Sequence, residues 1–246
     1  MTEIQKIIPA LFLHIQKTAG SSLLEMVYRH YRNNLTRHGD CWGHAPDEFK
    51  DILFVSGHFG YEFAKHLMQG RFTFTFLRDP AERIISLYYF CRGRKPDQFL
   101  IYRRANELDF QSFLEAGFTD PMVKTHIWNN QVWQLAYGYY NGPLDNKRAD
   151  DFSAEKLLEL AKEHLEEFSF IGFTETADQD GMKILSALNI PSGTGIPKVN
   201  ITENRPRVAD LSANAVILLD ELTFLDKQLY AYALERRKRS EGETGA

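Results

Sequence analysis

The stretch ALFLHIQKTAGSSLLEMVYRHY, residues 10–31, decides the fold of this chain. Its residues 10–15 form an apolar run of the length of a short buried strand, and the apolar residues between Leu23 and Tyr31 recur at helical spacing. The intervening QKTAGSS contains Gly20, which lets the backbone approach a bound anion closely. Because the N–H groups of a first helical turn point at such an anion, this strand–loop–helix segment predicts a phosphate-binding loop.

The side chains of this loop add a positive charge and hydroxyl donors. Lys17 supplies a mobile ammonium group, and Ser21 and Ser22 can cap the helix and donate hydrogen bonds. The loop differs from a Walker A motif, in which the lysine follows the glycines, because Lys17 precedes Gly20 here. The predicted anion-binding residues are Lys17, Thr18, Ala19, Gly20, Ser21 and Ser22.

A second strand–loop–helix segment contains LRDPAERIISLYYF, residues 77–90. The strand is predicted to end at the first of these residues, and Pro80 stands where a helix can begin. Arg78 follows the strand directly and Ser86 lies two helical turns further on, so both could clamp one phosphate. The other charged residues near this turn could instead brace it through an internal salt bridge, and both interpretations stay open for Asp79 and Arg83.

The rest of the chain alternates between apolar runs and amphipathic segments. Strands are predicted at 52–56, 72–77 and 168–174, and helices at 81–92, 109–116, 122–137, 154–168, 182–189 and 210–237. A basic segment at 93–106 breaks this alternation and is predicted as a loop or an excursion from the fold. Strands separated by helices indicate an α/β fold with a central parallel sheet flanked by helices, whose ligands bind at the carboxyl ends of the strands. We expect a single domain over 1–240 and a disordered tail over 241–246.

Composition limits the class of protein. Of the 246 residues, 43% are hydrophobic and 25% are charged, as in an ordinary globular protein. The net charge of −4 argues against broad nucleic-acid binding, which needs a basic face. No apolar run is long enough to span a bilayer, no secretory hydrophobic region follows Met1, and there are 2 cysteines. We therefore expect no membrane span and a cytoplasmic location.

In this order, the two phosphate segments resemble those of the carbohydrate sulfotransferases that use 3′-phosphoadenosine 5′-phosphosulfate (PAPS), above all the heparan sulfate 2-O and 6-O group and its soluble bacterial relatives. HIQKTAG at 14–20 is similar to the 6-O branch, and RDPAERIISLYYF at 78–90 is similar to the 2-O branch. Weaker similarities lie in WNNQVWQLAYG at 128–138, FIGFTETAD at 170–178, VNITENRP at 199–206 and the final helix. The resemblance implies a P-loop-like sulfotransferase fold that moves a sulfuryl group from PAPS to a hydroxyl group, with a glycan as the expected acceptor.

The resemblance also implies roles for individual residues of the two segments. The first loop would hold the 5′-phosphosulfate through Lys17, Ser21 and Ser22, and the second would hold the 3′-phosphate through Arg78 and Ser86. A later loop could cover the nucleotide, and this stays open for Asn200, Thr202 and Arg205.

Transfer to an alcohol needs a base that takes the hydroxyl proton. SGHFGY at 56–61 follows a predicted strand, which places His58 at the same edge of the sheet as the phosphate motifs. The 2-O branch has its proposed catalytic histidine in a similar Gly-His string, so the resemblance implies His58 as the base. That branch has a second histidine two positions earlier, where this chain has Ser56, and the other histidines, His14 included, are expected to be structural or at the surface. Lys17 is expected to stabilise charge on the leaving 3′,5′-bisphosphate.

Two other functions stay open. A P-loop-type nucleotide kinase or NTPase would carry its lysine after the glycines and an acidic strand end for Mg²⁺, and neither arrangement is clear here. A non-catalytic nucleotide-binding protein on the same fold would lack a base such as His58. No residue cluster has zinc spacing and no acidic pair indicates a magnesium site, so we expect chemistry without a metal.

Overall fold

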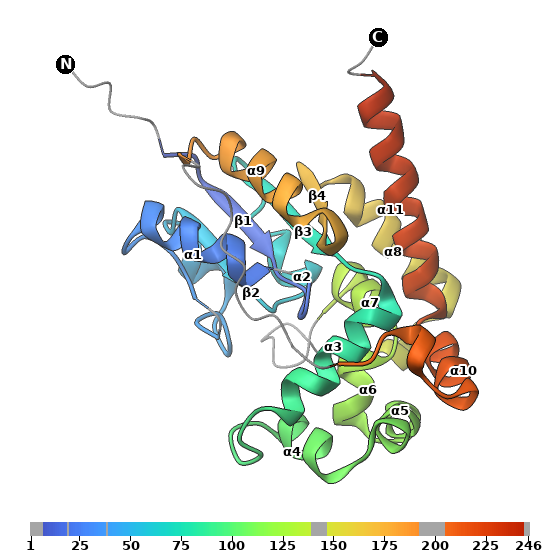
Figure 1. Ribbon diagram of the computed structural model, residues 1–246. Helices are drawn as coiled ribbons and strands as arrows, with labels where there is room; N and C mark the ends of the chain where they lie inside the picture. Colours follow the sequence, from blue (N-terminus) through green and yellow to red (C-terminus); the bar gives the residue numbers. More distant parts are fainter. Residues whose placement is uncertain (1–6, 19, 38, 139–146, 192–204, 244–246) are drawn as a thin grey trace, which may run out of the picture. The chain divides into compact units, whose positions relative to one another are not determined.

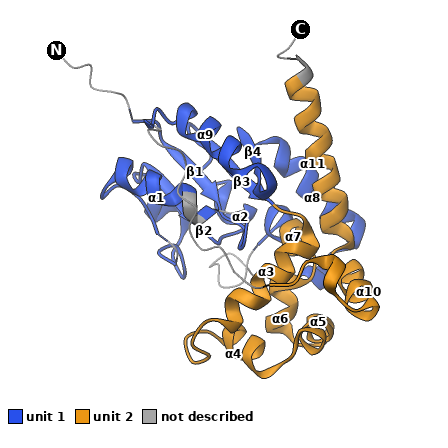
Figure 2. Ribbon diagram, viewed as in Figure 1, with its two compact units in different colours: residues 1–77, 133–200 blue, residues 78–132, 201–246 orange. Residues whose placement is uncertain are grey.

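The chain forms two compact units. The computed structural model describes residues 7–18, 20–37, 39–138, 147–191 and 205–243. Contacts within the chain group residues 1–77 with 133–200, here unit 1, and residues 78–132 with 201–246, here unit 2 (Figure 2). Each unit has an apolar core of its own. A single domain over 1–240 stays a prediction.

Unit 1 contains a parallel sheet. Its strands in the described residues are β1 (Ala10–Leu13), β2 (Phe54–Gly57), β3 (Phe72–Leu77) and β4 (Phe170–Phe173), which pair in the order β2-β1-β3-β4 (Figure 1). Every pairing between neighbours is parallel. The helices of this unit are α1 (Gly20–Tyr31), α2 (Tyr61–Ala64), α8 (Ala154–Glu166) and α9 (Ala177–Ala187), and α7 (Asn130–Ala136) begins in unit 2 and ends in unit 1. The predicted α/β class is confirmed.

Helices flank this sheet on both faces. Alternate residues of a strand point to opposite faces, and Phe12 of β1 joins an apolar cluster with residues of α1 and α9. Leu11 and Leu13 are also fully buried and point to the other face. There α2 contacts β1, and the ring of Tyr61 on α2 stacks on that of His164 on α8, with ring centroids 3.5 Å apart. The sheet is thus enclosed, and its carboxyl edge is where polar residues gather.

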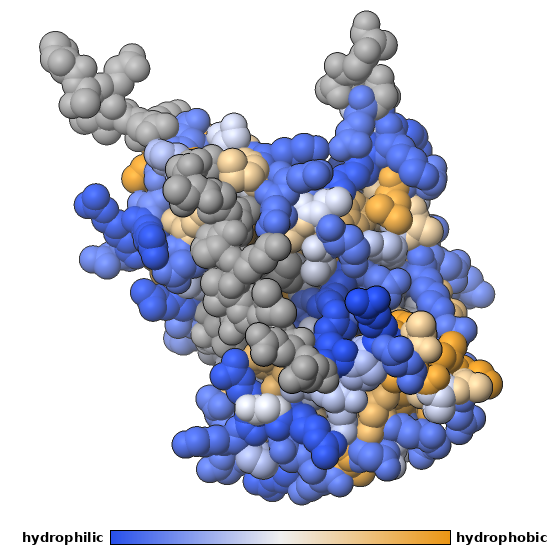
Figure 3. Space-filling model, in the orientation of Figure 1, coloured by the Kyte–Doolittle hydropathy of each residue, from blue (hydrophilic) through white to orange (hydrophobic). Residues whose placement is uncertain are grey.

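Unit 2 is helical in its described residues. Its helices are α3 (Pro80–Arg92), α4 (Leu100–Glu107), α5 (Phe110–Thr119), α6 (Pro121–Ile127), α10 (Ala213–Leu222) and α11 (Phe224–Glu243). Ile84, Phe113, Ile127 and Leu222 are fully buried in one core cluster shared by α3, α5, α6 and α10. Apolar side chains also reach the surface of this unit, where Ile217 of α10 is 55% exposed and Figure 3 shows apolar atoms in the area of that helix.

Predicted bounds agree best where a short local signal marks them. β3 covers the predicted residues 72–77. α3 ends at Arg92, before Gly93, as predicted. α11 continues to Glu243, inside the segment predicted as a tail, and residues 244–246 lie outside the described residues.

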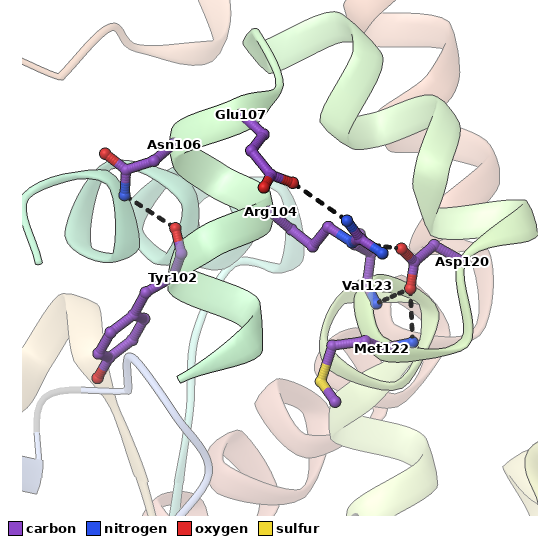
Figure 4. A network of polar contacts seen from close by, with 7 residues as sticks. All are labelled: Tyr102, Arg104, Asn106, Glu107, Asp120, Met122 and Val123. Carbon is purple, nitrogen blue, oxygen red and sulfur yellow. Dashed lines mark hydrogen bonds and ion pairs between the residues drawn. The ribbon is translucent and has the colours of Figure 1, made fainter. Parts of the chain in front are cut away.

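The basic segment predicted as a loop over 93–106 contains most of a helix, α4. Arg104 on this helix pairs with two carboxylates, since its Nε lies 2.7 Å from Oδ2 of Asp120 and its Nη1 lies 3.1 Å from Oε2 of Glu107 (Figure 4). Asp120 also caps α6 by accepting a hydrogen bond from the backbone N–H of Met122 at 2.9 Å. This tertiary contact does not show in the local composition, so the prediction was wrong for the helical part.

The prediction of single helices over 122–137 and 210–237 is also wrong, and one residue explains both interruptions. Asn129 separates α6 from α7 and has a positive φ of 41°. Its side-chain Oδ1 accepts the backbone N–H of Leu225 at 2.8 Å, at the start of α11, and its own N–H donates to the carbonyl of Leu222 at the end of α10. Asn129 therefore ends one helix and caps another that is far away in the sequence.

A buried charged cluster anchors α3. Arg83 is fully buried, and its Nη2 donates to the carbonyl of His126 at 2.8 Å. Asp226 of α11 accepts the backbone N–H of Val132 at 2.8 Å. Burial raises the pKa of Asp226 to about 6, against the opposing charge of Arg83. Burial, together with a smaller effect of the Arg83 charge, lowers the pKa of His126 to about 4. Arg83 therefore has a structural role inside unit 2, while the internal salt bridge at the turn that was left open for it stays a prediction.

We predict opposite pH dependences of stability for two variants of this cluster. The pKa of His126 falls from 6.5 to about 4 on folding, so its stabilisation is lost as the pH drops through that window. The pKa of Asp226 rises from 3.8 to about 6, so its stabilisation is lost as the pH rises through that window. As the pH rises from about 4.5 to 6, the free energy of unfolding of Asp226→Asn should increase relative to wild type. That of His126→Asn should decrease, each by up to about 1.4 kcal/mol per pH unit.

Urea unfolding at the two pH values measures these slopes. The exposed His66 offers a matched control, because His66→Asn removes an imidazole outside the cluster. Equal pH slopes in all variants would show that the cluster does not titrate as inferred.

Candidate active site

The β1–α1 loop is the first half of the predicted site. β1 ends at Leu13 and α1 begins at Gly20, and the first turn of α1 contains no acidic residue that would oppose an anion. Thr18 is fully buried, and its Oγ1 donates to the carbonyl of Ile15 at 2.8 Å. Its hydroxyl proton is thus used inside the loop, and its backbone N–H is the group that it can offer to a ligand.

Lys17 has an unusual backbone conformation. Its φ of 68° lies in the left-handed region, which non-glycine residues rarely adopt. Such conformations concentrate at ligand sites, where the surrounding structure enforces them. This observation supports the loop as a binding site. Ala19 lies outside the described residues, as do the side chains of Ser21 and Ser22.

His58 lies directly after β2 and is 7% exposed. Its Nδ1 donates to the backbone carbonyl of His14 at 2.5 Å. Because Nδ1 carries the proton in that bond, Nε2 holds the basic lone pair of the neutral ring. Gln134 donates from Nε2 to the same carbonyl at 3.2 Å and to the carbonyl of Phe59 at 2.9 Å. The bond from Nδ1 fixes the tautomer and the orientation of the His58 imidazole, and Gln134 holds the carbonyl that accepts it.

His14 is a second imidazole at this edge of the sheet, although it was expected to be structural or at the surface. The register of β1 and β2 pairs Leu13 with Gly57, so the residues that follow them are neighbours. The rings of His14 and His58 have centroids 4.6 Å apart and planes inclined by 39°. A methyl group built on Gly20 would lie 2.4 Å from Nε2 of His14. The chain therefore has a histidine pair, formed by two strands and not within SGHFGY.

The β3–α3 turn is the second half of the predicted site. The backbone N–H of Arg78 donates to Oε1 of Gln131 at 3.0 Å, and Nε2 of Gln131 donates back to the carbonyl of Arg78 at 3.0 Å. Gln131 is 1% exposed, so this exchange is shielded from water. Asp79 is the N-cap of α3 and accepts the backbone N–H of Glu82 at 2.9 Å. Asp79 thus has a structural role at this turn as a helix cap, while the internal salt bridge left open for it stays a prediction.

The side chain of Arg78 lies beside a carboxylate. It is 13% exposed, and its Nη2 is 3.9 Å from Oε2 of Glu82. Arg205 approaches the same oxygen more closely, with its Nη1 at 2.5 Å. Two guanidinium groups thus converge on one carboxylate oxygen, an arrangement that could also hold a phosphate oxygen. Ser86 is 4% exposed on α3.

The predicted site residues are divided between the two units. Lys17, Thr18, Gly20 and His58 belong to unit 1, and Arg78 and Ser86 belong to unit 2. Within unit 1, the pairing of β1 with β2 brings the loop and His58 to one edge of the sheet. Asn200 and Thr202, for which a nucleotide contact stayed open, lie outside the described residues.

Four residues of these surroundings were not selected from the sequence: His14, Glu82, Gln131 and Gln134. Gln131 and Gln134 are 1% and 0% exposed and stand three positions apart within WNNQVWQLAYG. Two amides at helical spacing in a largely apolar segment were a usable signal. Glu82 stands four residues after Arg78, the spacing of a helical ion pair.

The described residues offer no group of three or more His, Cys, Asp or Glu side chains that could hold a metal ion. Among the helices within the same ranges, none is both long enough and apolar enough to cross a bilayer. The polar groups at the two halves of the predicted site are cationic side chains, imidazoles, amides, backbone N–H groups and, in unit 2, the carboxylates of Asp79 and Glu82.

Comparisons with known proteins give the class. The model of a family described as the sulfotransferase family matches residues 5–233. The chain therefore belongs to the sulfotransferase family, which confirms the resemblance drawn from the two phosphate segments. It is 24% identical over 275 residues to a protein of Mus musculus, heparan-sulfate 6-O-sulfotransferase 3, and the match covers 91% of this chain. The match covers 56% of the length of that relative, so the chain spans little more than half of it.

Gln131→Leu should destabilise the protein by about 1–3 kcal/mol, because it leaves the buried N–H and carbonyl of Arg78 without their partner. Gln228→Leu makes the same change at an exposed amide, which donates to the carbonyl of Phe224 at 3.2 Å. That control should stay within about 0.5 kcal/mol of wild type. Urea unfolding measures both, and equal losses would mean that the Gln131 bridge adds no stability of its own.

Proposed function

We propose that this protein transfers a sulfuryl group from PAPS to a hydroxyl group of a carbohydrate. Membership of the sulfotransferase family supports the reaction, and the relative named for its action on heparan sulfate supports a glycan acceptor. The observation that carries the proposal is the position of His58, oriented by the carbonyl of His14 beside the β1–α1 loop. A base beside an anion-binding loop is what transfer of a charged group to an alcohol requires.

The β1–α1 loop would hold the 5′-phosphosulfate of the donor. The first N–H groups of a helix have no partner within the helix and favour an anion at its axis. Lys17, on the loop before Gly20, would add a positive charge, and Ser21 and Ser22 would add hydroxyl donors. No acidic side chain in the first turn of α1 weakens this site.

Arg78 and Ser86 would bind the 3′-phosphate, with Arg205 as a further cation. Both arginines approach the carboxylate of Glu82, at 3.9 and 2.5 Å. A phosphate carries more charge than a carboxylate and accepts paired hydrogen bonds from a guanidinium fork, so it would compete well for Arg78. The resulting preference is for a nucleotide with a phosphate at the 3′ position.

Proton transfer would be the task of His58. Its Nε2 would take the proton of the acceptor hydroxyl while the acceptor oxygen forms a bond to sulfur. On the opposite side of the sulfur, the bond to the 5′-phosphate oxygen breaks, and its electron pair stays on that oxygen. Lys17 would stabilise the charge that develops there. The imidazolium then returns its proton to water, and the products are a sulfated glycan and 3′-phosphoadenosine 5′-phosphate (PAP).

PAP should stabilise the fold by about 2.7 kcal/mol at a hundredfold excess over its Kd. Adenosine 5′-phosphate differs only by the missing 3′-phosphate and should bind much more weakly. Arg78→Ala should lower the affinity for PAP by about tenfold to a hundredfold, because a charge-assisted hydrogen bond is lost. The affinity for adenosine 5′-phosphate should stay almost unchanged. Calorimetric titration measures these affinities.

Arg29→Ala is the matched control for this titration, because the Arg29 side chain is 79% exposed and its Nη2 lies 3.1 Å from the exposed carboxylate of Glu25. Its PAP affinity should equal that of wild type. Equal affinities of the wild type for PAP and adenosine 5′-phosphate would remove Arg78 and Ser86 from a 3′-phosphate site.

His58→Ala should lower the rate of sulfuryl transfer by about 10²–10⁴-fold and leave the Kd for PAP within about twofold, since a base that faces the acceptor does not bind the nucleotide. Transfer of ³⁵S from labelled PAPS to chemically desulfated heparin measures the rate. His66→Ala, at an exposed position, controls for the loss of an imidazole elsewhere. A His58→Ala protein with the wild-type rate would return His58 to a structural role.

A further inference from the structure

His14 lies next to two parts of the proposed site, the base His58 and the start of α1 at Gly20. Its ring lies 4.6 Å from the ring of His58, centroid to centroid. Its Nε2 also lies so close to Gly20 that a methyl group there would approach it to 2.4 Å. The His14 imidazole therefore stands next to the base and also next to the first residue of α1.

The backbone around His14 holds this ring in place. The His14 N–H donates to the carbonyl of Gly57 at 3.1 Å, which continues the β1–β2 pairing by one residue. The His14 carbonyl accepts from His58 at 2.5 Å and from Gln134 at 3.2 Å. The ring of Phe12 stacks on that of His14, with centroids 4.7 Å apart and planes inclined by 22°. A side chain fixed on both sides can act with little reorganisation.

The geometry of sulfuryl transfer suggests what a side chain at this position would contact. In an in-line transfer, the sulfur lies between the acceptor oxygen, next to the base, and the leaving phosphate oxygen, next to the helix N-terminus. The remaining sulfuryl oxygens project sideways from that line and carry negative charge. A hydrogen-bond donor that touches both the base and the helix start is in the place to meet them.

We propose that His14 is a second catalytic imidazole, which donates a hydrogen bond from Nε2 to an oxygen of the sulfuryl group. The proposal rests on the function proposed above, because it takes the 5′-phosphosulfate to lie at the β1–α1 loop. It assigns Gly20 a second purpose as well, since any side chain there would displace the donor. It concerns the sulfuryl group alone and not the phosphates of the nucleotide.

A pure packing role for His14 makes a different prediction. A ring that only fills space between Phe12 and His58 can be replaced by an apolar side chain of similar size, such as leucine. A donor at Nε2 cannot, but glutamine places an amide N–H near that position. The pair His14→Gln and His14→Leu therefore separates hydrogen bonding from packing.

The test compares two ligands that differ only in the sulfuryl group, PAPS and PAP. In calorimetric titration, we expect His14→Leu to raise the Kd for PAPS by about threefold to tenfold and to keep the Kd for PAP within about twofold of wild type. His14→Gln should retain both affinities. In ³⁵S transfer to desulfated heparin, His14→Leu should lose about 10²–10³-fold in rate and His14→Gln about tenfold or less.

The outcomes separate the two proposals. If the wild type binds PAP no better than adenosine 5′-phosphate, the proposed function fails at its 3′-phosphate site before His14 is tested. If the wild type prefers PAP, but His14→Leu keeps both the PAPS affinity and the transfer rate, the role of His14 as a donor is overturned. A loss of PAP affinity equal to that of PAPS in His14→Leu would also overturn it, since the effect would then not depend on the sulfuryl group. The binding comparison decides the question even if desulfated heparin is not an acceptor.

Discussion

The parallel pairing of β1 with β2 is the constraint on which the proposed chemistry depends. Its register joins Leu13 to Gly57, and the N–H of His14 continues the ladder to the carbonyl of Gly57. Because parallel strands end at the same edge, this register delivers His14 and His58 as neighbours beside the start of α1. A shift of β2 by one residue against β1 would turn His58 to the opposite face from His14 and separate the base from the phosphate loop.

The predicted binding residues of the two units would attract an anion by different interactions. The set in unit 1 relies on backbone N–H groups, one lysine in a left-handed conformation and the His58 imidazole, oriented by a backbone carbonyl. The set in unit 2 relies on side-chain charge, because two arginines share the carboxylate of Glu82. Arg83 stands apart from both, since its charge is buried against His126 and Asp226 inside the core of unit 2. An arginine close to a motif in sequence is therefore not by itself a ligand.

Local signals predicted much of the fold and part of the candidate site. The apolar runs of β1 and β3, the glycine of the first loop and the proline of the second are each readable within a few residues. What could not be read depends on partners far apart in sequence. Asn129 interrupts one predicted helix and caps another at Leu225, and Arg104 stabilises a helix through Asp120. The meeting of His14 with His58 likewise follows from strand register, which a single strand does not reveal.

A crystal structure of the protein with bound PAP tests the central claim most directly, namely that the β1–α1 loop holds the 5′ end of a sulfuryl donor. The 5′-phosphate should lie about 3 Å from backbone N–H groups at the start of α1, with Lys17 beside it and the His14–His58 pair next to the position of the missing sulfuryl group. The 3′-phosphate should contact Arg78. A nucleotide bound away from this loop, or bound with its 3′-phosphate at Gly20, would contradict that claim.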